Sequence, residues 1–176
     1  MALGEAEFKE GLITAIPHMR AFARTLCRGG DHANDIVQET LLKAWEKRAD
    51  LNSMECLKPW LFKILRNNFL AGHYRSRREI SDVDGEHAAR LTVSANQPQK
   101  LDFEIVMQAV DKLPAAQREA LVLTSVEGLA YHEVAEICGC SIGTVKSRVS
   151  RARAGLIQQF GAFSEFAGPS KSDWAA

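Results

Sequence analysis

Apolar residues recur every three or four positions along most of the chain, which predicts amphipathic α-helices. The first apolar stripe comprises Phe8, Leu12, Ile16, Met19, Phe22 and Leu26. It predicts a helix that ends near Gly29-Gly30, and Asp31 is expected to cap a second helix that runs to about Arg48. Residues 49–56 are expected to form a loop. A third helix is predicted over about 57–78.

The helical period returns in the C-terminal half. Phe103, Val106, Val110 and Leu113 predict a fourth helix that Pro114 ends, and another helix follows as far as Glu127-Gly128. A short helix around Tyr131–Cys138, a turn at Gly139-Cys140 and a last helix capped by Ser141 come next. Val145, Val149, Ala152 and Leu156 form the apolar stripe of this last helix. Two short helices joined by a glycine turn are typical of a helix-turn-helix.

Residues 79–100 show no sustained period and are acidic. A structureless stretch of this length is unusual inside one compact domain, so we interpret it as a flexible linker. The predicted fold class is all-α, with two small helical domains at 1–78 and 101–160 and a tail at 161–176. No apolar run approaches the roughly 18–20 residues that span a bilayer, and no secretory signal is visible, so we expect a cytoplasmic protein without a membrane partner.

The formal net charge of the 176 residues is zero, which at first argues against a nucleic-acid partner. Two segments nevertheless contain no acidic residue. Residues 57–78 carry six basic side chains and residues 138–160 carry four. These segments coincide with the predicted third and last helices, so the neutral total conceals two basic helices.

The last helix is suited to reading duplex DNA. Its polar face, opposite the apolar stripe, comprises Lys146, Ser147, Ser150, Arg151 and Ala154. Small side chains allow close approach to the major groove, and lysine or arginine reach phosphates or guanine edges. On the third helix, Asn67, Asn68, His73 and Tyr74 stand among cations, which suits melted or single-stranded nucleic acid. The alternative for both helices is a solvated basic face, with Trp60 and Phe62 in the core.

Polar residues also follow one side of the second helix, including Asp35, Gln38 and Glu39. No phosphate-binding loop, zincin motif or nucleophile elbow accompanies them, so we expect a protein-docking helix rather than an enzyme, with no cofactor. Cys138-Gly-Cys140 with His132 leaves a metal site as an alternative. Because a structural zinc site needs two ligand pairs at short spacing, we expect the cysteines to be small buried residues and no metal to be bound.

Four segments together resemble the extracytoplasmic-function type of bacterial sigma factor. They are Asp31-His-Ala-Asn-Asp35-Ile-Val-Gln38-Glu39-Thr-Leu-Leu-Lys-Ala-Trp45, Trp60-Leu61-Phe62-Lys63-Ile64-Leu65-Arg66-Asn67, Leu113-Pro114-Ala-Ala-Gln117-Arg118-Glu119-Ala120 and Gly143-Thr144-Val145-Lys146-Ser147-Arg148-Val149-Ser150-Arg151-Ala152-Arg153. Residues 16–24 and 136–140 look most similar to the general-stress subgroup of alphaproteobacteria.

The resemblance implies three interfaces. Core RNA polymerase would be bound by Asp35, Ile36, Gln38, Glu39 and Leu41. The melted minus-ten promoter element would be bound by the loop at 49–56 and by Lys63, Arg66, Asn67, Tyr74 and Arg77. The minus-thirty-five element would be read by Thr144, Lys146, Ser147, Ser150 and Arg151. The subgroup is also held inactive by a small antisigma protein, which a phosphorylated response regulator with a sigma-like domain displaces.

Two positions depart from the family pattern. Ala130 stands where many members have a serine cap, so Glu133 is expected to matter more at this helix N-terminus. Ser150 replaces a bulkier residue, which leaves the base preference there open. The principal alternative function is a free-standing helix-turn-helix regulator, although residues 8–78 then have no evident purpose.

Overall fold

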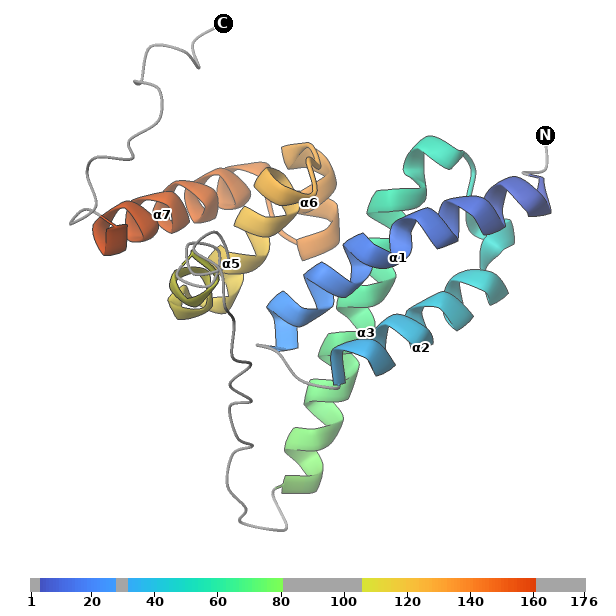
Figure 1. Ribbon diagram of the computed structural model, residues 1–176, viewed down its shortest axis with the longest axis horizontal. Coiled ribbons are helices and arrows are strands. Elements are labelled where there is room, and N and C mark those ends of the chain that lie inside the picture. The colour runs from blue at the N-terminus through green and yellow to red at the C-terminus, as the bar shows by residue number, and fades with distance from the viewer. Residues whose placement is uncertain (1–3, 28–31, 81–105, 161–176) are drawn as a thin grey trace, which may run out of the picture.

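The computed structural model describes residues 4–27, 32–80 and 106–160, with the side chains of 74–80 excluded. All the regular elements in these ranges are helical, as the hydrophobic period predicts (Figure 1). The Asp31 cap, the tail and nearly all of the predicted linker lie outside the described residues.

Three helices form the N-terminal domain: α1 (Glu5–Cys27), α2 (His32–Glu46) and α3 (Leu57–Ile80). Each turns its apolar side toward the core, where Phe8, Leu12, Met19 and Phe22 of α1 are buried and Ile16 and Leu26 are half-buried. The three helices pack against one another. The rings of Phe22 and Phe62 meet edge to face with centroids 5.1 Å apart, which joins α1 to α3. Phe8 likewise contacts Trp45 of α2 and Trp60 of α3.

The connection between α2 and α3 is more ordered than the sequence predicts. It contains two 3₁₀-helices, η1 (Arg48–Asp50) and η2 (Met54–Cys56), where we expected only a loop over 49–56. The Ser53 hydroxyl accepts a hydrogen bond from the backbone N–H of Glu55 (3.3 Å), which caps η2. Such side-chain capping is local and has no hydrophobic period, so periodicity alone does not reveal it.

The C-terminal domain begins in the structure with helical residues 106–112. Pro114 ends this segment, and α5 (Ala115–Leu121) follows. The next residues, Val122–Val126, form a π-helix, η3. The helix predicted to reach Glu127 is therefore α-helical only as far as Leu121. The wider turn of η3 is closed by a hydrogen bond of 3.0 Å from the Glu127 N–H to the Val122 carbonyl. The helices α6 (Tyr131–Cys138) and α7 (Ile142–Phe160) complete the domain.

The two domains pack directly against each other (Figure 1). Helix α6 lies on α3, and α5 and η3 lie on α1. Buried apolar residues from both domains form one continuous cluster. The sequence left the arrangement of the domains open, because an interdomain contact has no periodic signal. The structure therefore describes a closed arrangement.

Candidate nucleic-acid and polymerase interfaces

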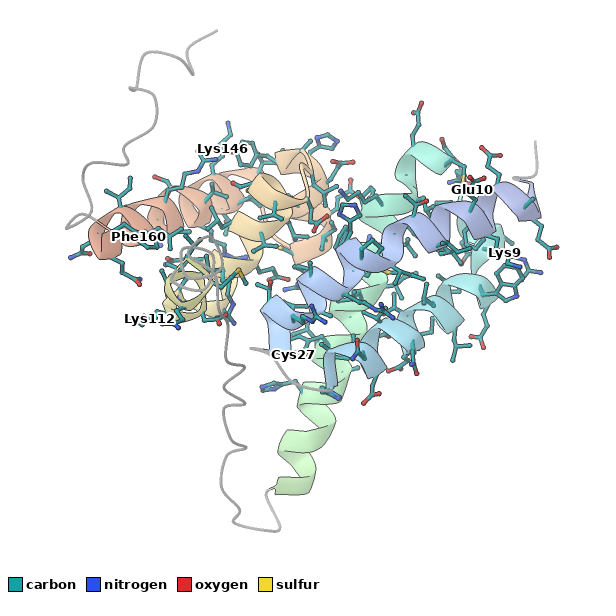
Figure 2. The ribbon with its side chains drawn as sticks, in the orientation of Figure 1. Lys9, Glu10, Cys27, Lys112, Lys146 and Phe160 are labelled. Atoms are coloured by element: carbon teal, nitrogen blue, oxygen red, sulfur yellow. The ribbon has the colours of Figure 1, made fainter. Side chains whose placement is uncertain are left out.

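Helix α7 has the two faces that the sequence predicts. Val145, Val149 and Ala152 are buried, whereas Lys146, Ser150 and Arg151 are exposed. Figure 2 shows Lys146 projecting away from the body of the protein. Thr144 and Ser147 are half-buried, and the Ser147 hydroxyl donates to the Thr144 carbonyl (3.0 Å). The face thus offers two cations flanked by small side chains, which suits entry into a major groove.

Caps fix the start of α7 and the angle between α6 and α7. The Ser141 hydroxyl accepts a hydrogen bond from the Thr144 N–H (3.1 Å), as expected of an N-cap. Gly139 adopts a left-handed conformation (φ 63°, ψ 41°), in which a residue with a Cβ is strained. The Cys140 N–H then donates back to the Ala135 carbonyl (3.0 Å), which closes the turn. The predicted helix-turn-helix is confirmed.

Glu133 supports the N-terminus of α6, where Ala130 offers no side-chain cap. Its carboxylate accepts a hydrogen bond of 2.7 Å from the Ala130 N–H. This interaction is one half of a capping box, and a carboxylate in the first turn also stabilises the helix dipole. The prediction that Glu133 matters at this position therefore has a direct structural basis.

The basic face of α3 is only partly free. Lys63 and Asn67 are exposed, whereas Arg66 lies against the C-terminal domain with its side chain 19% exposed. The side chains of Tyr74 and Arg77 lie outside the described residues. Two of the five residues predicted for melted DNA are thus presented to solvent, and a third is engaged within the molecule.

Asn68 faces the opposite way and ties α3 to α2. Its amide donates to the Thr40 hydroxyl (3.1 Å) and its carbonyl accepts from Lys43 Nζ (2.6 Å). Thr40 in turn donates to the Ile36 carbonyl (2.7 Å). Buried polar groups need such partners, so this network holds the two helices in one relative position.

Helix α2 presents Asp35, Gln38 and Glu39 to solvent, with Leu41 half-buried beside them. Glu39 is also bonded to Lys43 (2.7 Å). Ile36 does not share this surface, because it is 3% exposed and packs in the core. The family resemblance grouped it with the docking residues, but its position on the helix directs it inward. Gln38 and Leu41 also line a groove of about 380 Å³ between α1 and α2, together with Arg20 and Arg24.

The cysteines have no metal-binding arrangement in the described part of the chain, where no group of three or more potential ligands gathers. Cys138 is buried beside α3, and burial together with the nearby Glu119 carboxylate raises its pKa to about 12. Cys56 is exposed. Among the described helices, none is long and apolar enough to cross a membrane.

Comparisons with known proteins identify the family. The models for sigma-70 region 2 and sigma-70, region 4 match residues 12–79 and 103–156. The ECF RNA polymerase sigma factor EcfG of Rhodopseudomonas palustris is 45% identical over 148 residues, which are 84% of this chain and 82% of that protein. The chain belongs to the extracytoplasmic-function sigma factors. RNA polymerase sigma factor NccH of Alcaligenes xylosoxydans is 34% identical over 149 residues, 79% of this chain and 80% of that protein.

A solved structure also resembles this sigma factor. The sigma factor RpoE of Bartonella quintana, crystallised with the anti-sigma factor NepR, matches with a TM-score of 0.79 and 42% identity. The match covers 88% of this chain and 97% of that chain. With EcfG, it supports the likeness to the alphaproteobacterial general-stress subgroup. We call the two domains of this sigma factor the region 2 domain (4–80) and the region 4 domain (106–160).

Sequence reasoning missed two acidic residues that join the domains of this sigma factor. Glu119 of α5 and Glu127, which follows η3, are both buried. Glu119 pairs with Arg66 (Oε1–Nε 2.5 Å), and Glu127 Oε2 lies 2.9 Å from His18 Nδ1 and 3.2 Å from Lys58 Nζ. Their only signal in the sequence is a charged side chain within otherwise apolar helical segments.

Proposed function

We propose that this sigma factor is the promoter-specificity subunit of RNA polymerase in its cell. The region 2 domain docks on core polymerase and captures the melted minus-ten strand, while the region 4 domain reads the minus-thirty-five duplex. The observation that carries this proposal is the presence of both sigma regions, in order, on one chain. This function requires the protein to act in the cytoplasm, where polymerase and promoter DNA meet.

The exposed polar residues of α2 are the proposed polymerase contact. Asp35, Gln38 and Glu39 offer acceptors and donors on one helix face, and Leu41 adds apolar area beside them. An interface of this kind combines a small apolar centre with a polar rim. We include the adjoining groove, which Arg20 and Arg24 line, because it extends the same surface onto α1.

Promoter contacts are divided between two helices. Lys63, Arg66, Asn67, Tyr74 and Arg77 on α3, with the connection at 49–56, are proposed for the melted strand, where cations follow phosphates and amides bind unstacked bases. Lys146, Ser150 and Arg151 on α7 are proposed for direct reading of the upstream duplex. Thr144 and Ser147 support that face from the first turns of the helix.

Control by a small antisigma protein is the second part of the proposal. It rests on the similarity to RpoE of Bartonella quintana, which was crystallised with such a protein. Release by a response regulator with a sigma-like domain, and the transcription of stress genes, follow from the same subgroup resemblance.

Reconstituted transcription tests the proposal. Purified core polymerase is combined with the full chain and with promoter templates, and the start site of each transcript is mapped. A sigma factor makes initiation depend on the chain and on both promoter elements. Tight binding of the chain alone to promoter duplex, with no stimulation of initiation, would instead indicate a free-standing helix-turn-helix regulator.

A further inference from the structure

The first turn of α7 presents an exposed aliphatic side chain, Ile142, among polar groups that bond to each other. The Ser141 hydroxyl accepts a hydrogen bond from the Thr144 N–H (3.1 Å) and is bonded to the Thr144 hydroxyl (2.9 Å). Gly143 has no side chain, and Ile142 is 46% exposed. Single exposed aliphatic residues are common on protein surfaces, so the position of Ile142 decides what it can do.

Ile142 lies at the end of the helix that enters the major groove in a helix-turn-helix. In this motif, the N-terminal residues of the second helix contact the base edges. Side chains on a helix tilt toward its N-terminus, and Ile142 is the first helical residue of α7. Lys146, four residues further along and so on the same side of the helix, projects away from the body of the protein (Figure 2). A duplex that meets Lys146 therefore also meets Ile142.

Gly143 leaves room for a base beside Ile142. A Cβ added at Gly143 would meet the Ser141 Oγ at 3.8 Å, which is an ordinary van der Waals contact. Gly143 also lacks the positive φ that Gly128 and Gly139 adopt. The fold itself therefore does not require glycine at this position. Because a side chain is absent, the wall of a groove can approach the backbone closely.

Thymine is the base whose edge matches an aliphatic side chain. The base edges in the major groove present hydrogen-bond donors and acceptors, and thymine adds a methyl group at C5. An isoleucine side chain forms no hydrogen bonds, so it gains free energy by covering that methyl group. Against a polar edge it would instead remove water from donors and acceptors without replacing their hydrogen bonds. Both effects favour thymine over cytosine.

We propose that Ile142 reads the 5-methyl group of a thymine in the minus-thirty-five element. This inference rests on the proposed role of α7 as the recognition helix. Lys146 and Arg151 reach phosphates or guanine edges, and phosphate contacts position a protein without specifying a sequence. Ile142 adds an apolar, base-specific contact at the end of the helix. It is thus a specificity-determining residue that the charge pattern of α7 does not reveal.

The test removes the methyl group from the DNA and its partner from the protein, separately and together. A promoter that initiates in the reconstituted assay supplies the probe. Each thymine on either strand of its upstream element is replaced in turn by deoxyuridine, which pairs in the same way and lacks the methyl group. Ile142→Ala shortens the side chain, and Ile142→Gln keeps its length but ends in an amide.

Ile157→Ala is the matched control, because it removes the same atoms from the same helix. Ile157 is 70% exposed and lies about 22 Å further along α7, at about 1.5 Å per residue. Thermal unfolding verifies that each variant is folded. Because Ile142 is also exposed, its replacement should leave the fold intact, and if one Ile142 variant does not fold, the other decides.

The affinity of each holoenzyme for each promoter fragment is measured by competition. With the wild type and with Ile157→Ala, deoxyuridine should weaken binding about fourfold at one thymine, the factor expected when one methyl group is left in water. At the same thymine, the Ile142→Ala and Ile142→Gln holoenzymes should lose less than about 1.5-fold. Such non-additivity in a double-mutant cycle shows that the two groups are in contact.

Equal losses in the wild type and the Ile142 variants overturn the proposal, as does an upstream element in which no thymine is sensitive to deoxyuridine. Lys146→Ala with Arg151→Ala separates this failure from failure of the proposed function. If that double variant weakens promoter binding while Ile142 shows no coupling to a thymine methyl group, only the reading by Ile142 is wrong. If the double variant binds the promoter as tightly as the wild type, the role assigned to α7 is wrong.

Discussion

Asn67 and Asn68 are neighbours on α3, yet Asn67 is exposed and Asn68 is 6% exposed and bonded to Thr40 and Lys43. Successive residues on a helix lie about 100° apart, so adjacent identical side chains have different surroundings. The amide of Asn67 is available to a base, and the amide of Asn68 holds α2 against α3. The two residues therefore provide a matched pair for separating recognition from stability.

Replacement of Asn67 by alanine should impair open-complex formation. We expect the exposed amide to form hydrogen bonds with an unstacked base. Its loss should lower the rate or extent of promoter opening by up to about tenfold, given roughly 0.5–1.5 kcal/mol for such a contact. Permanganate footprinting of the melted region provides the measurement. Affinity for core polymerase should be unchanged, and its loss in this variant would mean that Asn67 is structural.

Replacement of Asn68 by alanine should instead destabilise the region 2 domain. The Thr40 hydroxyl and the Lys43 ammonium lose a buried partner, and the free energy of unfolding should fall by about 1–3 kcal/mol. Urea denaturation followed by circular dichroism checks this value. A variant as stable as the wild type would show that the Asn68 network contributes nothing.

Helix α2 allows a similar separation. Asp35→Ala with Gln38→Ala removes exposed polar groups and should weaken binding to core polymerase at least tenfold, with thermal stability unchanged. Ile36→Ala should behave in the opposite way, because Ile36 is buried and truncation of a core isoleucine costs about 2–5 kcal/mol. Surface plasmon resonance on immobilised core enzyme gives the affinities. If the Ile36→Ala variant is fully folded but binds core polymerase more weakly, Ile36 does contact polymerase, as the family resemblance implies.

Hydrophobic period predicted the helices well because burial of one face is what stabilises them. Tyr131–Cys138 was predicted with the bounds that α6 has, and the buried stripe of α7 was predicted residue by residue apart from Leu156, which is half-buried. Charge segregation likewise identified the two basic helices. Hydrophobic period and charge segregation are local properties of the chain, so both can be read from a single sequence.

Features that depend on contact between distant segments were not predictable. The pairing of Arg66 with Glu119 joins residues 53 positions apart, and no local pattern marks either side chain as a partner of the other. The π-helical turn before Glu127 has no distinct composition. The family resemblance grouped the buried Ile36 with exposed residues for a related reason, since a family motif groups residues by sequence and not by the direction of each side chain.

Cys138 and Cys56 should differ strongly in reactivity. The thiolate is the nucleophile, and a pKa of about 12 leaves Cys138 almost fully protonated at pH 8, whereas Cys56 is exposed. Iodoacetamide at pH 8 should therefore alkylate Cys56 first and Cys138 only after denaturation. Peptide mass spectrometry assigns the sites, and rapid alkylation of Cys138 in the folded protein would contradict the burial.

The same thiol gives stability a pH dependence of definite sign. Because the folded state retains the Cys138 proton above the ordinary pKa of 9.0, its contribution to stability is complete below pH 9 and declines as the pH rises toward 12. In the Cys138→Ala variant, the free energy of unfolding should fall less steeply as the pH rises above 9. The free energy of unfolding is measured against pH for both proteins. If it falls equally steeply in both between pH 9 and 11, Cys138 does not cause the decline.

Simultaneous replacement of Lys146 and Arg151 by alanine should weaken recognition of the upstream element. Both side chains are exposed on the face of α7 that carries no core residue. Each phosphate contact contributes about 0.9 to the slope of log affinity against log salt, so the double variant should bind less tightly and lower that slope by up to about 2. Lys9→Ala with Lys112→Ala removes the same charge at positions away from Lys146 and serves as the control (Figure 2). Because the control preserves α7, its holoenzyme should keep the salt dependence of the wild type. If the Lys146→Ala/Arg151→Ala holoenzyme binds the promoter as tightly as the wild type, α7 is not the recognition helix.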